Sequence, residues 1–280
     1  MRYGAQVQAA IDLYNEIGRT NTPADKCMSN YFRNRRFIGS KDKATIAGLI
    51  YGLMRRMGEV DYLIESVKGD KSYRMRIFVY MLLDGSTKQL IENICSGDTF
   101  APDLLNKEEK KNISAIDFGA LQSAPDCAKY NYPRWMEYSL KKAYGKKLPE
   151  IMEAMNQQAT TDIRVNTLKS NVENVQAALL KDGFEMRRTP YSQNCLRMDE
   201  RKSVFVTESF KKGHFEMQDE GSQLIAELCG AKPGDKVVDF CAGAGGKTLA
   251  LSAMMQNRGG LQALDIHERR LNEMPKRLKR

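Results

Sequence analysis

Asp239-Phe240-Cys241-Ala242-Gly243-Ala244-Gly245-Gly246-Lys247-Thr248 is the stretch of this sequence that decides its fold. A strand is predicted over 236–240, where the apolar run Val237-Val238 is typical of a parallel strand buried on both faces. A helix is predicted over 245–255, a second strand over 261–265, and another helix from residue 269 onward. This β-α-β-α order predicts the first part of a doubly wound parallel sheet, with the glycines at the turn between strand and helix.

The glycine-rich turn has the chemistry of a nucleotide site. Glycine adopts positive φ and lets a ligand approach the backbone closely. The free N–H groups and the dipole of a helix N-terminus favour an anionic group. Asp265 ends the second predicted strand, about twenty residues beyond Gly243, where such folds place a carboxylate that accepts hydrogen bonds from a ribose.

Three other interpretations of the turn follow from the residues alone. A phosphate-binding P-loop needs a glycine where Cys241 stands, and the dinucleotide pattern G-x-G-x-x-G needs one where Thr248 stands. Both motifs are therefore incomplete. The remaining alternative is a glycine turn that only packs a helix tightly on a sheet, with Asp265 as a cap at the strand end.

The hydrophobic periodicity predicts a multidomain chain. Residues 1–125 are expected to form an all-α domain with helical spacing of apolar residues, and residues 126–212 to contain a linker helix and a small α+β module of ferredoxin-like type. Residues 213–280 form the first β-α-β-α part of a Rossmann-like α/β domain. The elements expected in the α+β module are strands over 163–167, 184–188, 195–198 and 203–207 and a helix capped by Asn171.

Charge and amino-acid composition indicate which binding partners to expect. The chain has 280 residues with 44 Lys+Arg against 35 Asp+Glu, a net charge of +9, which favours a polyanion such as RNA over a role in solubility alone. No two cysteines are spaced as C-x-x-C and only two histidines occur, so no metal site is expected. The sequence has no apolar run that could cross a membrane and no signal-like start, so we expect a cytoplasmic protein.

DFCAGAGGKT resembles the cofactor motif of the Sun-type (RsmB/NOP) RNA cytosine-C5 methyltransferases, approximately D-x-C-A-A-P-G-G-K-T, and differs at Gly243 and Ala244. Other segments agree with the resemblance. QDEGSQL at 218–224, DIHERRL at 265–271 and IRVNTLK at 163–169 are similar to family segments. Segments 38–43 and 50–55 are similar to the helical, NusB-like extension of bacterial members, where RNA is the expected ligand.

The resemblance implies particular site residues. S-adenosyl-L-methionine would be bound by Cys241, Ala242, Gly243, Ala244, Gly245, Gly246, Lys247 and Asp265, with Arg270 supporting that loop. In the α+β module, Arg164, Asn166 and Lys169 are candidates to position RNA or to brace the module against the catalytic domain. The alternative for these three is a purely structural strand.

A basic cluster in the helical domain is a second candidate RNA site. Arg33, Arg35 and Arg36 lie close in sequence to the aromatic residues Tyr31, Phe32 and Phe37. Basic groups neutralise phosphates, and exposed aromatic rings can stack on unpaired bases. The alternative is a solvated loop whose aromatic residues belong to the core.

In this family a cysteine thiolate attacks C6 of cytosine and a second cysteine assists product release, in P-C-x-G and T-C-S segments after the cofactor loop. No cysteine of this chain follows a proline and no Thr-Cys-Ser occurs, so no catalytic residue is assigned. We expect part of an rRNA cytosine-C5 methyltransferase, truncated before those motifs and inactive alone.

The expected truncation has three explanations, since 276–280 resembles the middle of a helix. They are a boundary chosen for expression, a split or frameshifted gene, and a second chain that carries the missing catalytic half. The alternative function is a non-catalytic RNA-binding protein or a split-gene remnant.

Overall fold

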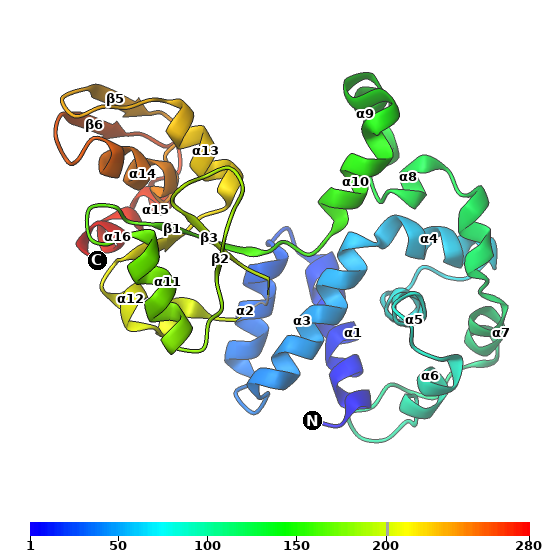
Figure 1. Ribbon diagram of the computed structural model, residues 1–280. Helices are drawn as coiled ribbons and strands as arrows, with labels where there is room; N and C mark the ends of the chain where they lie inside the picture. The colour runs from blue at the N-terminus through cyan, green and yellow to red at the C-terminus, as the bar shows by residue number, and fades with distance from the viewer. Residues whose placement is uncertain (200–201) are drawn as a thin grey trace. The chain divides into compact units, whose positions relative to one another are not determined.

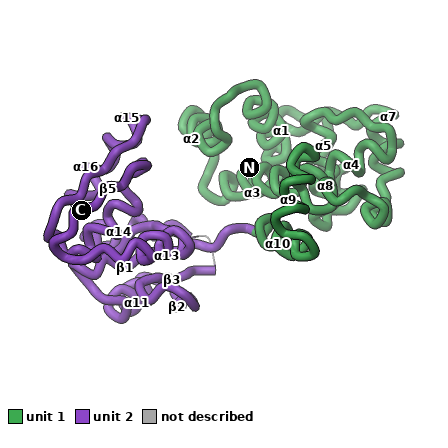
Figure 2. Tube along the Cα trace, turned by 90° about the horizontal axis from the view of Figure 1, so that it is seen from above, with its two compact units in different colours: residues 1–157 green, residues 158–280 purple. Residues whose placement is uncertain are grey.

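The computed structural model describes residues 1–199 and 202–280. The chain forms two compact units, Met1–Gln157 and Gln158–Arg280 (Figures 1 and 2). Each unit has its own hydrophobic core. The structure thus has two units, whereas the sequence pattern predicts three domains. The second unit contains both the α+β module and the glycine-rich loop.

The first unit is helical, as the apolar spacing predicts. Its central helix α5 (Tyr73–Leu83) is apolar around most of its circumference, buries seven of its eleven residues, and is surrounded by other helices (Figure 1). The other helices are α1 (Tyr3–Arg19), α2 (Ala24–Asn34), α3 (Ser40–Arg55), α4 (Met57–Ser66), α6 (Lys88–Ile94), α7 (Lys107–Ala115), α8 (Asp126–Lys129), α9 (Glu137–Tyr144) and α10 (Leu148–Asn156). Single 3₁₀ turns lie at Phe118–Ser123, Arg134–Met136 and Gly145–Lys147.

The expected limit at residue 125 differs from the observed end of the helical unit at Gln157. Helix α8 packs so tightly on α4 that a Cβ added to Gly58 would lie 2.9 Å from the carbonyl oxygen of Ala128. The side chain of Asn131 accepts a hydrogen bond from the backbone N–H of Glu59 at 3.1 Å and donates one to its carboxylate at 3.1 Å. These contacts attach the segment that the sequence assigns to a linker to the first unit.

The second unit begins with a four-stranded antiparallel sheet in the order β2-β3-β1-β4. Its elements are β1 (Thr161–Val165), α11 (Val172–Lys181), β2 (Arg187–Arg188), β3 (Cys195–Met198), α12 (Glu208–Lys211) and β4 (Phe215–Met217). The side chain of Asn171 accepts a hydrogen bond from the N–H of Asn174 at 2.8 Å, which confirms the expected helix cap.

One expected strand of the sheet is wrong and another was missed. The segment expected as a strand over 203–207 is a 3₁₀ turn at Val204–Val206 that leads into α12. The fourth strand is β4 instead, which pairs with β1 and lies beyond the expected domain limit at residue 212. At three residues, β4 is too short to show an alternating pattern.

The rest of the second unit has the predicted β-α-β order. Strands β5 (Lys236–Asp239) and β6 (Gly260–Ala263) pair in parallel, and the helices are α13 (Glu220–Leu228), α14 (Gly246–Met254), α15 (Glu268–Leu271) and α16 (Met274–Lys279). Val237 packs against a small core with Leu251 of α14. Val238 is 54% exposed, so β5 is not buried on both faces as expected, because the two-stranded sheet is covered on one face only within the described chain.

Strand β1 has two different buried faces. Ile163 and Val165 point to the apolar core under α11, while Asp162 and Arg164 alternate with them and are also buried. The Asp162 carboxylate accepts two hydrogen bonds from the guanidinium of Arg197, at 2.7 and 2.6 Å, directly across the strand pair. It also accepts one from the N–H of Glu220, at the start of α13.

The contacts of Asp162 decide its ionisation. Burial opposes the charged form, but the hydrogen bonds from Arg197 and from the backbone of Glu220 outweigh it and lower the pKa of Asp162. One buried carboxylate therefore ties β1, β3 and α13 together while ionised.

Asp162→Ala is expected to lower the free energy of unfolding by about 3 kcal/mol, because the partly buried guanidinium of Arg197 loses its two-bonded partner and keeps only the longer contact with Glu220 at 3.4 Å. The estimate is at the lower end for such pairs, since the Arg197 side chain keeps 21% exposure. Urea unfolding followed by circular dichroism measures the change.

Asp199→Ala is the matched control, since it removes an ion pair with Arg187 whose side chains are 53% and 65% exposed. It should cost less than about 1 kcal/mol. Equal losses in the two variants would contradict the role given to Asp162.

Candidate cofactor site

The glycine-rich loop joins the end of β5 to the start of α14, as the sequence predicts. Gly243 has φ +54° and Gly245, which precedes the helix, has φ +85°. Both conformations are unfavourable for residues with a side chain. A Cβ added to Gly245 would also lie 2.7 Å from Cγ of Met274, so packing as well as backbone geometry requires glycine here.

Acidic residues at the ends of both strands hold the loop. The Thr248 hydroxyl donates to the Asp239 carboxylate at 2.7 Å. The two oxygens of Asp265 accept hydrogen bonds from the N–H groups of Gly243 and His267, each at 2.8 Å. The His267 and Gly243 N–H groups lower the pKa of Asp265, so its carboxylate is ionised at neutral pH and retains unused lone pairs.

The structure brings most of the sequence-predicted cofactor residues together. Ala242, Gly243 and Gly245 are buried in the loop, whereas Cys241 and Lys247 are exposed. The Arg270 guanidinium lies over Gly243, with Nη2 3.1 Å from the position of an added Cβ. Loop, carboxylate and guanidinium thus share the carboxyl ends of β5 and β6, where such sheets bind ligands.

Two exposed apolar side chains also flank these strand ends. Phe240 is 75% exposed and Ile266 is 93% exposed. Neither was predicted from the sequence, because Phe240 belongs to the expected buried strand 236–240 and Ile266 is a single apolar residue between Asp265 and His267. Their exposure beside Asp239 and Asp265 makes them candidate walls for a planar apolar group.

Charged residues of the antiparallel sheet and of α16 also contact the glycine-rich loop. Arg164 donates through Nη1 to the carbonyl oxygen of Gly246 at 3.1 Å, and lies opposite Glu216 in the β1–β4 pair. Arg277 donates to the carbonyl oxygen of Ala244 at 2.7 Å and to the Glu216 carboxylate at 2.7 and 3.0 Å. Burial lowers the pKa of Arg164 to about 10, so it stays charged at neutral pH.

Sequence analysis missed Glu216 and Arg277 among these charged residues. Glu216 stands in the short strand β4, and Arg277 belongs to a run of basic residues at 276–280 that is typical of a solvated helix face. No local signal marks either residue, because their partners are distant in sequence.

The structure separates the candidate RNA residues by environment. Arg164 is 7% exposed and braces the loop, so it is not on the surface. Asn166 and Lys169 donate to the carbonyl oxygens of Gly213 and Lys212, at 3.0 and 3.2 Å, and hold the turn before β4. The contact of Arg164 fits the bracing interpretation, and those of Asn166 and Lys169 fit a purely structural role.

The basic cluster of the helical unit is more exposed than Arg164 of β1. Arg33 and Arg36 are exposed, and the half-buried guanidinium of Arg35 lies 3.8 Å from the ring centroid of the buried Tyr31.

The cysteines differ in exposure, and Cys229 and Cys241 are the exposed ones. Cys95 and Cys195 are buried, and burial raises the pKa of each thiol to about 11, which leaves little thiolate at neutral pH. Cys241 is exposed but belongs to the cofactor loop. Within residues 1–199 and 202–280, no group of three or more His, Cys, Asp or Glu side chains could hold a metal ion. No helix in this part of the chain is long and apolar enough to cross a membrane.

A glycine loop between a parallel strand and a helix, with an acidic residue at the end of the next strand, is typical of Rossmann-like nucleotide-binding domains. Residues 227–280 match the family model of the 16S rRNA methyltransferase RsmB/F. Residues 132–205 match the ferredoxin-like domain of the RsmF/B-like methyltransferases. Two segments of the chain are thus similar to domains of the RsmB/F methyltransferases.

Similar proteins agree with this family. Over 259 residues, 87% of this chain and 61% of the relative, the chain is 26% identical to the ribosomal RNA small subunit methyltransferase B of Proteus mirabilis. It is 30% identical over 149 residues to the protein of the same name from Pseudomonas syringae pv. tomato, covering 53% of this chain and 33% of that protein. The aligned part of this chain thus corresponds to 61% of the length of the Proteus mirabilis protein.

Solved structures support the fold. A structure described as PH0851 superposes with a TM-score of 0.73 at 23% identity, over 100% of this chain and 67% of that one. A methyltransferase homolog protein from Pyrococcus horikoshii gives a TM-score of 0.50 at 30% identity, over 55% of this chain and 50% of that one.

Gly245→Ala tests the packing of the loop. We expect it to lower the free energy of unfolding by about 1 kcal/mol more than Gly183→Ala. Gly183 has φ +82° but nothing within 4 Å of an added Cβ, so the control carries the same backbone strain without the contact with Met274. Urea unfolding of both variants measures the difference, and equal destabilisation would show that the loop has room at this position.

Proposed function

We propose that this chain forms the RNA-recognition and cofactor-binding part of an rRNA cytosine-C5 methyltransferase that uses S-adenosyl-L-methionine. The observation that carries the proposal is the arrangement of Gly243, Asp265 and Arg270 at the strand ends, in a chain with segments similar to domains of the RsmB/F methyltransferases. The relatives named as ribosomal RNA small subunit methyltransferases support an rRNA substrate.

The loop fits the proposed cofactor. The first N–H groups of α14 have no partner within the helix and suit the carboxylate of the methionine portion. Asp265 holds the loop through Gly243 and has lone pairs left to accept hydrogen bonds from ribose hydroxyls. When bound, S-adenosyl-L-methionine supplies an electrophilic methyl group.

The chemistry of methyl transfer to C5 of cytosine needs a thiolate that adds to C6. None of the six cysteines stands in a Pro-Cys or Thr-Cys-Ser sequence, and Cys95 and Cys195 are buried thiols. We therefore propose that these 280 residues bind cofactor and RNA but do not complete the reaction. The same observation favours the second candidate, a non-catalytic RNA-binding protein, which would bind RNA without the cofactor.

Calorimetry with S-adenosyl-L-methionine tests the cofactor site. Asp265→Ala should weaken binding about tenfold or more, because a charge-assisted hydrogen bond contributes about 1.5–3 kcal/mol. Asp199→Ala, an exposed carboxylate far from the loop in sequence, should bind as the wild type does. Wild-type protein that binds RNA but shows no heat of cofactor binding would support the second candidate.

Incubation of the chain with rRNA and methyl-labelled S-adenosyl-L-methionine tests the role of the cysteines. We expect no labelled 5-methylcytosine after digestion and chromatography, with a full-length family member as the positive control. Labelled product from these 280 residues would show that one of their own cysteines serves as the nucleophile.

A further inference from the structure

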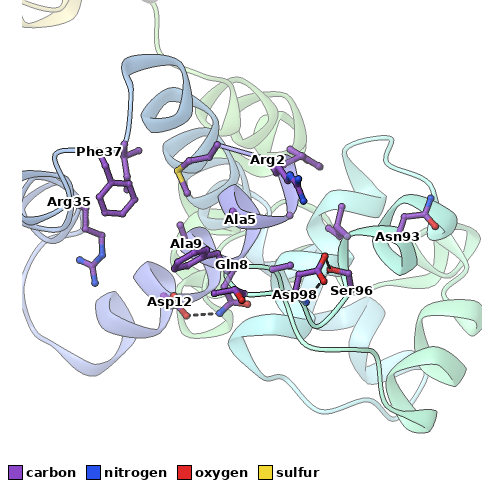
Figure 3. A pocket seen from close by; sticks show the side chains of 18 of the residues that line it. Arg2, Ala5, Gln8, Ala9, Asp12, Arg35, Phe37, Asn93, Ser96 and Asp98 are labelled. Carbon is purple, nitrogen blue, oxygen red and sulfur yellow. Dashed lines mark hydrogen bonds between the residues drawn. The ribbon is translucent and has the colours of Figure 1, made fainter.

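The helical unit contains a groove that the cofactor chemistry does not use. Its volume is about 1160 Å³, and it is lined by residues of α1, of the connection between α2 and α3, and of the segment after α6 (Figure 3). Figure 3 shows Ala5, Gln8 and Ala9 of α1 between Phe37 on one side and Asp98 on the other. This volume exceeds the range of about 300–1,000 Å³ for small-molecule pockets, which favours an extended ligand.

Two large aromatic side chains line the groove and remain in solvent. Phe37 is 75% exposed and Phe100 is 80% exposed. Phe100 also has φ +89°, a left-handed conformation that is rare for a bulky residue. Two backbone hydrogen bonds hold the turn that carries Phe100. The Ala101 N–H donates to the Asp98 carbonyl at 2.8 Å, and the Gly97 N–H donates to the Pro102 carbonyl at 3.1 Å.

The exposure of Phe100 needs an explanation, because the chain maintains an unfavourable backbone conformation without burying the ring. Strain of this kind concentrates at ligand-binding segments. A ligand that covers the ring would supply the burial that the free protein lacks.

The groove has two arginines available to contact anionic groups, and Asp12 and Asp98 balance their charge. Arg2 and Arg35 line the groove, and Arg33 and Arg36 lie beside it in sequence; among the described residues none of these four forms an ion pair. The two carboxylates that line the groove are engaged by neutral donors. Gln8 donates to Asp12 at 2.7 Å and Ser96 donates to Asp98 at 2.9 Å.

We propose that this groove binds unpaired RNA, with Phe37 and Phe100 stacking on bases and Arg2 and Arg35 contacting phosphates. Aromatic stacking platforms combined with arginines are the chemistry of single-strand recognition, and it tolerates sequence differences because every base has a flat face. The inference rests on the proposed function, since it assigns the RNA of that reaction a place on the helical unit.

Binding of the whole chain to a fluorescein-labelled single-stranded RNA of eight nucleotides, followed by anisotropy, tests the groove. Phe37→Ser and Phe100→Ser should each weaken binding about tenfold. Trp135→Ser is the matched control, because Trp135 is 80% exposed in the same unit but does not line the groove, and its affinity should not change. Thermal unfolding of each variant confirms that the fold is retained.

A second probe separates stacking from charge. An RNA with 2-aminopurine in place of one adenine should change in fluorescence when it binds the wild type, and the change should be lost in the two phenylalanine variants. Retained affinity and retained fluorescence change in both variants would overturn the proposal, as would equal affinity for a fully paired RNA. Calorimetry with S-adenosyl-L-methionine reports on the cofactor loop separately, so failure of the groove and failure of the proposed function are distinguishable.

Discussion

The second unit depends on the burial of two opposite charges on one face of β1. Asp162 binds Arg197 of β3 and the first turn of α13, and Arg164 binds the backbone of the cofactor loop. Burying charges is costly unless each finds a partner, so these contacts fix position more than they add stability. Because the other face of β1 fills the apolar core, a single five-residue strand sets the place of the loop relative to the antiparallel sheet.

The conformation of the glycine-rich loop is fixed by contacts within the chain. Gly243 and Gly245 have the conformations that the turn requires, and Asp239 and Asp265 each bind a group of the loop or helix. Preformed geometry of this kind lowers the ordering cost of binding. The groove of the helical unit differs, since its exposed rings have no partner within the unit that would hold them in place.

Sequence alone predicts elements whose signal is local. The glycine-rich turn, the capped helix after Asn171 and the helix Tyr73–Leu83 were all predictable, because glycine conformation, capping and apolar spacing act over a few residues. The strand β4, the end of the first unit at Gln157 and the contact of Arg277 with the loop were not. Each depends on pairing or packing between residues distant in the chain.

The central position of β1 has a consequence for motion. It is hydrogen-bonded on both edges, to β3 and to β4, whereas β2 is paired on one edge only. Backbone amides in such a strand exchange with solvent only when the sheet opens, while edge strands fray more easily. Since Arg164 is part of β1, the backbone that carries its bond to Gly246 stays in place while the sheet is closed. Fluctuations that would loosen the start of α14 are therefore coupled to the slowest opening of the antiparallel sheet.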